Sequence, residues 1–383
     1  MRQGIISADT HLDLMWMPRD TWQLRLPSAM AERGPKVVET DKGTFWEWED
    51  SLHGVAADGG SNATFTRMLS ERGLPAPEGS LPPSDPELLL QHMDRQGIYA
   101  SVLFGGRQWK FVKDPELLKA VYAVYNDFAL ELSHSAPNRL IVLPNVTARL
   151  PEECPRQIEQ LALRGVKAVE FPYWDAGAPL FEQVWEPTWR MAEETGVALC
   201  AHLGNNGEFP PRRRGAHTAF FSAIPFAIAR PVAELVFSGA FEAQPKLKFC
   251  FAETRVGWTP FFLYWMDRQV LVREDDPRIT DVPVDQAKLS LLPSEYVKRN
   301  VVFTFEDDPP AVRLLESEWA GVAETALWGG DYPHPQGVWG AQLEGQLDGM
   351  FDGVDETLKK RVLFDHAAEF FGIRVPEEST AAR

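Results

Sequence analysis

Eight short apolar runs recur along this chain, and a stretch with helical features separates each run from the next. Nearly all of the runs are continuously apolar, which is typical of strands that are covered on both faces. Strands that alternate with helices pair in parallel through crossover connections. The predicted strands are residues 5–11, 98–104, 139–145, 166–171, 197–203, 247–253, 301–306 and 326–330.

This order of elements predicts an α/β fold in which the strands close into a (β/α)8 TIM barrel. The chain has 383 residues, 44% of them apolar, so it can bury one large core. A doubly wound open sheet is the alternative. Such a sheet normally carries a glycine-rich phosphate-binding turn after its first strand, where this chain reads D-T-H-L-D. We therefore expect one barrel domain over residues 1–383.

A long segment, residues 14–84, interrupts the alternation after the first predicted strand. It mixes tryptophans with many charged residues and ends in a stretch rich in proline and glycine. A segment of this length between regular elements is usually functional. We expect an insertion that acts as a lid or as a dimer contact. Its tryptophans are Trp16, Trp22, Trp46 and Trp48.

The composition narrows the possible partners. The chain has 38 lysines and arginines against 55 aspartates and glutamates, a net charge of −17, which disfavours nucleic acid and anionic membranes as partners. Three cysteines lie far apart, two of them in predicted strands, which indicates reduced thiols in a cytoplasmic protein. No continuous run of eighteen apolar residues occurs and the first residues lack a signal-peptide core, so we expect no membrane-spanning segment.

Metal-ligand residue types gather where the predicted strands end. Asp9 and His11 close the first strand on one face, His202 closes the fifth, and Asp331 follows the eighth. A lone histidine in an apolar strand is more often a core residue, and Asp9 alone could cap a turn. Their shared position at the carboxyl ends, where such barrels carry their sites, favours a divalent metal such as zinc or manganese.

Other charged residues lie near the same strand ends. Glu253 ends the sixth predicted strand, and His334 follows Asp331 by three residues. Arg107 and Arg255 come just after the second and sixth strands. Because a guanidinium pairs well with a carboxylate, these arginines indicate a substrate that is an anionic carboxylic acid.

Several of these motifs resemble one known family. The D-T-H of residues 9–11, His202 and the G-G-D-Y-P-H of residues 329–334 are similar to the amidohydrolase superfamily. The closer likeness is to its amidohydrolase-related branch, which includes aminocarboxymuconate-semialdehyde decarboxylase and γ-resorcylate decarboxylase. Further matches are M-D-R-Q-G-I at 93–98, Y-N-D-F at 125–128, P-K-L-K-F at 245–249 and the closing helix at 367–372.

The resemblance implies one catalytic divalent metal with Asp9, His11, His202 and Asp331 as ligands, and a homodimer. The family often has histidine or glutamate in place of Asp9, which leaves open whether Asp9 coordinates directly or through water. Decarboxylases of the branch typically carry a histidine where this chain has Glu253. Glu253 is therefore either an acid/base residue or a structural hydrogen-bond acceptor.

Three functional hypotheses follow. The first is a metal-dependent, non-oxidative decarboxylase of a small aromatic or conjugated carboxylic acid, in which Glu253 or Asp331 carries the proton and His334 orients a ligand or stabilises charge. The second is a hydrolase of an amide, lactone or C–C bond, in which Asp331 takes the proton of metal-activated water. The third is a non-catalytic barrel that acts as a binding protein. We expect Zn²⁺, with Mn²⁺ as the alternative.

Overall fold

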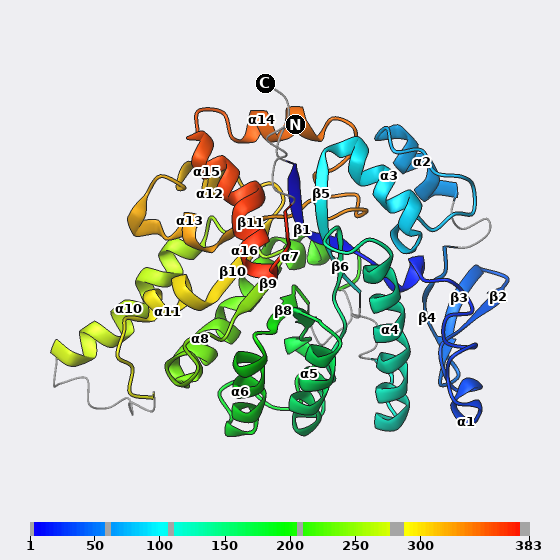
Figure 1. Cartoon of the computed structure of the whole chain (residues 1–383), viewed down its shortest axis with the longest axis horizontal. Helices are drawn as coiled ribbons and strands as arrows, with labels where there is room; N and C mark the ends of the chain where they lie inside the picture. Colours follow the sequence, from blue (N-terminus) through cyan, green and yellow to red (C-terminus); the bar gives the residue numbers. More distant parts are fainter. Residues whose placement is uncertain (1–3, 58–62, 106–110, 205–209, 276–286, 376–383) are drawn as a thin grey trace.

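The computed structural model describes residues 4–57, 63–105, 111–204, 210–275 and 287–375. Eight parallel strands form its centre, and helices surround them (Figure 1). Their burial is nearly complete on both faces, as the apolar runs predicted. The strands are β1 (Ile5–His11), β5 (Ile98–Phe104), β6 (Leu140–Val142), β7 (Ala168–Glu170), β8 (Ala198–His202), β9 (Phe249–Ala252), β10 (Val301–Phe305) and β11 (Ala326–Trp328).

Two seams close these strands into a barrel. The regular ladders form one sheet in the order β1-β5-β6 and another in the order β11-β10-β9-β8-β7. At one seam the backbone N–H of His11 donates to Tyr332 (2.7 Å), and at the other the N–H of Val146 donates to Glu170 (3.1 Å). These contacts join β11 to β1 and β6 to β7, so the predicted (β/α)8 barrel is confirmed.

Local sequence signals set the boundaries of the helices. In α3 (Pro86–Gln96) the Asp85 carboxylate accepts hydrogen bonds from the first turn, and Gly97 ends the helix at φ 72°. Asp114 caps α4 (Pro115–Ser135) in the same way. The other helices after β6 are α5 (Cys154–Leu163), α6 (Glu186–Thr195), α7 (Ala216–Ala223), α8 (Ala229–Phe237), α9 (Ala240–Ala243), α10 (Thr259–Asp275), α11 (Pro293–Asn300), α12 (Pro309–Arg313), α13 (Val322–Thr325), α14 (Leu343–Met350), α15 (Glu356–Lys360) and α16 (His366–Phe371).

The insertion forms a small antiparallel sheet beside α4, outside the barrel (Figure 1). The Trp22 indole N–H donates to the Val121 carbonyl (3.2 Å), and Arg25 pairs with Glu131 (2.8 Å), both on α4. The four tryptophans of the segment are buried. Its role as lid or dimer contact stays a prediction. The elements are α1 (Ser28–Ala31), β2 (Lys36–Thr40), β3 (Gly43–Trp48), β4 (Ser51–Val55) and α2 (Ala63–Glu71).

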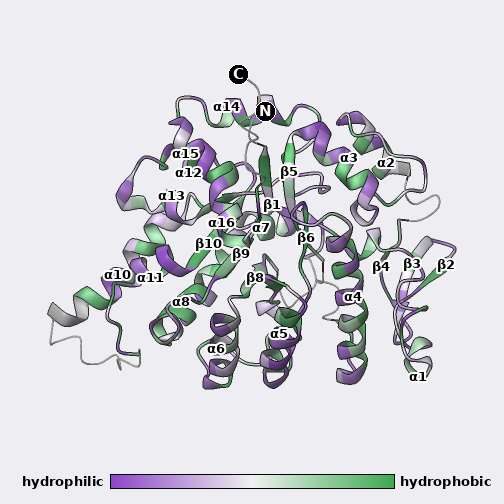
Figure 2. Ribbon diagram, viewed as in Figure 1, coloured by the Kyte–Doolittle hydropathy of each residue, from purple (hydrophilic) through white to green (hydrophobic). Residues whose placement is uncertain are grey.

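The barrel interior is packed with apolar side chains. Figure 2 shows the strands in the green of hydrophobic residues, while α4, α5 and α6 also carry purple, hydrophilic residues. Phe364, Ala367 and Phe371, from the last helical turns, pack in the same cluster as Ile6 on β1 and Ala198 on β8. These residues fill the end of the barrel where the strands begin. A functional site therefore has to lie at the opposite end, where β1 and β8 finish in polar residues.

The helical segment Ala216–Phe237 is long and apolar enough to cross a membrane by length and composition. Only 28% of its most apolar window is buried inside the protein. The segment is built of α7, a 3₁₀ stretch at Ile224–Ile228, and α8. Length and composition alone are weak evidence for a membrane span, but they identify a surface helix with an unusual excess of apolar residues.

The free energy of unfolding depends on pH through His366. Its Nδ1 faces the Ala326 carbonyl (3.0 Å), and burial, with a contribution from Arg361, lowers the pKa of His366 to about 4. The unfolded chain takes up the proton below about pH 6.5 and the folded chain only near pH 4. Stability is therefore lost as pH falls through this interval, by about 3 kcal/mol from this group.

We expect His366→Asn to reduce that loss, because an amide does not titrate. The measurement is urea unfolding of wild type and variant at several pH values between 7 and 4. The control is His134→Asn, since the His134 side chain is exposed. Parallel stability curves for wild type and His366→Asn would contradict the assignment.

Candidate metal centre

The first strand directs two side chains into the end of the barrel. Asp9 and His11 are buried in β1, whose pairing with β5 is irregular between Ser7 and Thr10. The hydroxyl of Thr304 on β10 donates to Asp9 Oδ2 (3.1 Å). This hydrogen bond holds the carboxylate so that its other oxygen, Oδ1, faces the two imidazoles.

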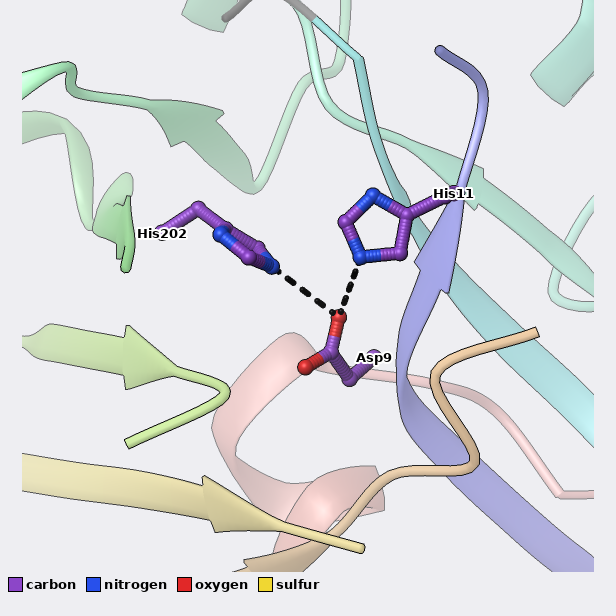
Figure 3. Close-up of side chains that lie close together, drawn as sticks. All are labelled: Asp9, His11 and His202. Carbon is purple, nitrogen blue, oxygen red and sulfur yellow. Dashed lines mark ion pairs between the residues drawn. The ribbon is translucent and has the colours of Figure 1, made fainter. Parts of the chain in front are cut away.

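Three donor atoms converge on one point (Figure 3). His11 Nε2 lies 3.4 Å and His202 Nε2 3.6 Å from Asp9 Oδ1. Metal–ligand bonds of about 2.0–2.2 Å place neighbouring donor atoms roughly 3–3.5 Å apart. Among the described residues, none hydrogen-bonds to Asp9 Oδ1 or His11 Nε2, although both atoms are buried. The donor set therefore fits a small divalent cation.

Each imidazole is oriented by its other nitrogen. His202 Nδ1 donates to the Leu203 carbonyl (2.9 Å), and His11 Nδ1 faces Asp13 Oδ1 (3.4 Å). A proton held on Nδ1 leaves the Nε2 lone pair directed into the centre. Both histidines are thereby prepared as ligands by residues next to them in the chain.

Asp331 enters the centre across the seam between β11 and β1. Its backbone N–H donates to the Asp9 carbonyl (2.9 Å), and its Oδ1 lies 3.1 Å from His11 Nε2. A Cβ atom on Gly329 would lie 2.3 Å from the Asp9 Cβ, so only glycine permits this approach. The structure thus places Asp331 beside His11, one member of the Asp9–His11–His202 group, and Asp331 forms a second group of possible ligands with His11 and His334.

His334 is held between two carboxylates. Its Nδ1 donates to Asp331 Oδ1 (2.6 Å) and its Nε2 to Asp13 Oδ2 (2.8 Å). Burial and the nearby His11 ring oppose the charged imidazolium, but Asp13 and Asp331 outweigh them and raise the pKa of His334 to about 9. Because both nitrogens donate, His334 is a charged partner of Asp331 and not a metal ligand.

The buried charges of the centre stabilise one another. Burial disfavours ionisation, yet His202 and His11 lower the pKa of Asp9 below its ordinary value. Burial likewise opposes protonation of His11, but Asp13, Asp331 and Asp9 raise its pKa well above the usual range. A metal ion requires neutral His11, so metal binding releases a proton and weakens in acid.

Two further predicted residues lie on the same rim. Glu253 Oε2 is 3.6 Å from His202 Nε2. The Arg255 guanidinium forms an ion pair with Glu306, which is almost fully buried, while about a third of the Arg255 side chain is exposed. Arg255 therefore lies at the rim, and its guanidinium is already paired with the Glu306 carboxylate. Arg107 lies outside the described residues.

Three residues at this rim have an unusual backbone conformation. Glu253, Arg255 and Asp331 have φ values of 59°, 62° and 55°, in the left-handed region that side chains other than glycine seldom adopt. Such strain persists where the surrounding structure over-determines the backbone, often at functional sites. Here the strained turns set the directions of the rim carboxylates.

Sequence reasoning missed three residues of the centre: Asp13, Thr304 and Glu306. Asp13 had a detectable signal, because it follows His11 by the same two-residue step that separates Asp9 from His11. Glu306 also had a detectable signal, since it is the last residue of the predicted strand 301–306. Thr304 gave none, because threonine is common inside strands.

Comparisons with known proteins agree with this geometry. Residues 9–373 match the family model for amidohydrolases. The chain is 24% identical over 302 residues to 2-amino-3-carboxymuconate-6-semialdehyde decarboxylase from Dictyostelium discoideum, which covers 76% of this chain and 77% of that protein.

Solved structures share the fold. An amidohydrolase from Mycobacterium avium subsp. paratuberculosis has a TM-score of 0.72 at 19% identity, over 98% of this chain and 100% of that one. A 5-carboxyvanillate decarboxylase from Novosphingobium aromaticivorans, complexed with manganese and 4-hydroxy-3-methoxy-5-nitrobenzoic acid, has a TM-score of 0.66 at 18% identity, over 97% and 96%.

We expect His202→Asn to abolish tight binding of a divalent metal, because it removes an Nε2 donor that faces the centre. The measurement is metal content by mass spectrometry after reconstitution and desalting. His366→Asn is the matched control, since His366 is a buried histidine at the other end of the barrel. One metal per chain in His202→Asn would contradict the ligand set.

We expect Asp13→Asn to weaken metal affinity about 10- to 100-fold without abolishing it, because Asp13 orients His11 from outside the ligand set. Competition with a chromophoric chelator measures the affinity. A variant with wild-type affinity would show that the neighbouring carboxylate does not support His11.

Proposed function

The chain belongs to the amidohydrolase family, and from that premise we propose that it is a metal-dependent enzyme that releases CO₂ from a small aromatic or conjugated carboxylic acid. The observation that carries the proposal is the buried group of Asp9, His11 and His202, with Asp331 Oδ1 3.1 Å from His11 Nε2. Two proteins to which this chain is similar support the reaction class. One is a decarboxylase of a carboxymuconate semialdehyde and the other of 5-carboxyvanillate.

Two nitrogen and two carboxylate donors suit either Zn²⁺ or Mn²⁺. We propose a single cation of this kind. The sequence favours zinc, whereas the similar 5-carboxyvanillate decarboxylase is complexed with manganese. When bound, the cation would hold the substrate oxygens and withdraw electron density from the carbon that loses its carboxylate.

Decarboxylation needs a proton at a defined place. The C–C bond to the carboxylate breaks, CO₂ departs, and the electron pair left on carbon takes a proton from an acid. We propose Asp331 as that acid, because His334 donates to its Oδ1 and is itself 25% exposed on its side chain. His334 can therefore return a proton from solvent to Asp331 after each turnover.

The substrate itself favours the acid form of Asp331. His11 and His334 together outweigh burial and lower the pKa of this carboxyl in the unliganded protein. A second carboxylate brought close to Asp331 acts in the opposite direction, since like charges disfavour ionisation. Glu253, 3.6 Å from His202, is the other carboxylate that could supply the proton.

We also propose how the substrate is held, where the protein is located and how it assembles. Arg255, and Arg107 outside the described residues, would pair with the anionic substrate. We propose a cytoplasmic homodimer without nucleic-acid or membrane partners, with residues 14–84 as a lid or contact. The location is supported by three cysteines that are all free and buried.

We expect the metal-loaded enzyme to release CO₂ from at least one member of a panel of hydroxybenzoic, vanillic and muconic acids, and chelation to stop the release. A coupled CO₂ assay with mass spectrometry of the product measures this. Release of an amine, alcohol or second acid without CO₂ would favour the hydrolase and refute the decarboxylase. A metal-free, folded and inactive protein would favour the non-catalytic barrel.

We expect Asp331→Asn to lower kcat at least 1,000-fold and Glu253→Gln to lower it less than about 10-fold. Metal content and the pH profile of kcat are measured for both, so that loss of the ion is separated from loss of the proton. The reverse order of effects would assign the proton to Glu253.

A further inference from the structure

The backbone of the turn after β9 is held by the end of β10 and the segment that follows it. Five consecutive N–H groups, those of residues 253–257, donate to two residues, Thr304 and Asp308. Three of the hydrogen bonds end on Thr304 and two on the Asp308 carboxylate. We call residues 253–257 the β9 turn. Because N–H groups shielded from water need acceptors, the conformation of the β9 turn depends on where these two residues lie.

Four hydrogen bonds of Thr304 join the β9 turn to the metal centre. Its carbonyl accepts from the N–H groups of Thr254 (3.2 Å) and Arg255 (3.1 Å). Its hydroxyl oxygen accepts from the Glu253 N–H (2.7 Å) and donates its own proton to Asp9 Oδ2 (3.1 Å). A hydroxyl has only one proton to donate. Since the Glu253 N–H occupies the acceptor side of the hydroxyl, that proton is directed at Asp9.

The second and fourth residues after Thr304 hold the rest of the β9 turn. Glu306 forms the ion pair with the Arg255 guanidinium, and Asp308 Oδ2 accepts from the last two N–H groups of the turn, both at 2.7 Å. A Cβ atom on Gly257 would lie 2.7 Å from Asp308 Oδ1, so glycine permits this close approach. Thr304, Glu306 and Asp308 are all buried. One side of the barrel rim therefore fixes both the backbone of the turn and its arginine.

The β9 turn carries two of the groups proposed above to meet the substrate. Glu253 Oε2 lies 3.6 Å from His202 Nε2, and the Arg255 side chain is partly exposed at the rim. Both residues have positive φ values, a conformation that is unfavourable for residues other than glycine unless the surroundings impose it. The hydrogen bonds to Thr304 impose it here, so a movement of Thr304 would reach both side chains.

The surroundings of the Thr304 hydroxyl differ from those of an ordinary buried threonine. A buried hydroxyl can be satisfied by any nearby carbonyl, as the Thr325 hydroxyl is by the Gly321 carbonyl (2.8 Å). The Thr304 hydroxyl instead lies between a carboxylate of the donor set and the backbone of the β9 turn. A shift of Asp9 on cation binding would therefore change the hydrogen bond that holds Glu253.

We propose that Thr304 is a positioning residue that couples cation binding at Asp9 to the conformation of the β9 turn. The inference rests on the divalent cation of the proposed function and is independent of the reaction. Coupling between two sites is reciprocal. The cation would order the β9 turn, and the ordered turn would raise the affinity for the cation. Glu253 and Arg255 would then take their final positions only in the loaded protein.

The first measurement is the affinity for Mn²⁺ and for Zn²⁺, by competition with a chromophoric chelator. Thr304→Val keeps the shape of the side chain but loses the hydroxyl, and is expected to lower the affinity about 10- to 100-fold. Thr304→Ser keeps the hydroxyl and is expected to restore the affinity of wild type. Thr325→Val is the matched control, because it removes a buried hydroxyl just before β11, at the other end of the barrel. Circular dichroism shows whether each variant is folded.

The second measurement is amide hydrogen exchange of the β9 turn by mass spectrometry. It reads the coupling directly, because the five N–H groups that Thr304 and Asp308 accept are the groups that exchange. Mn²⁺ is expected to slow their exchange about 10-fold in wild type and in Thr304→Ser, and to leave it unchanged in Thr304→Val. Helix α5, on the outside of the barrel, is the internal reference and is expected to exchange equally with and without Mn²⁺.

Four results would overturn the coupling: wild-type affinity in Thr304→Val, an affinity of Thr304→Ser as low as that of Thr304→Val, exchange in wild type that does not respond to Mn²⁺, or an equal response in all variants. A wild type that binds the cation without releasing CO₂ from any acid would refute the proposed reaction and leave the coupling intact, because neither measurement uses a substrate. A wild type that binds no cation would overturn both.

Discussion

The seam between β11 and β1 is the constraint on which the centre depends. Asp331 donates its backbone N–H to the Asp9 carbonyl at 2.9 Å, and Gly329 lets the two strands approach closely enough for that bond. Residues from the two ends of the chain thereby become neighbours at one rim. Asp9 and Asp331 would not lie at the same rim if the sheet were open at this point.

The seam also brings together buried charged side chains, each of which would be costly to bury alone. Isolated charges are costly to bury, but here carboxylates and imidazoles alternate. His334 lies between Asp331 and Asp13, and His11 faces Asp9, Asp13 and Asp331. Each group lowers the cost of burying its neighbours, so the removal of one member affects the whole set.

The sequence predicted what local chemistry determines. The boundaries of helix α3 are the kind of feature that a sequence can predict, because Asp85, Pro86 and Gly97 act on adjacent backbone. The four candidate ligands could be placed at one rim because barrel topology sends strand ends there. Strand lengths were less well predicted: residues 139–145 yield only Leu140–Val142 as a strand, because pairing with neighbours decides where a strand ends. The Arg255–Glu306 ion pair joins the segments that follow β9 and β10, and local sequence patterns do not show which residues pair across neighbouring strands.

A metal centre whose residues lie at the ends of strands can be formed before the metal ion binds. The backbone bonds of the seam, the Thr304 hydroxyl and the Leu203 carbonyl orient the candidate ligands through contacts within the protein. Small metal-folded domains instead exist as folded proteins only after they are loaded. A barrel whose donor residues are oriented in this way would fold before it binds a metal. The ion that it binds would then depend on which metals are available to the folded protein as much as on the preference of the donor residues.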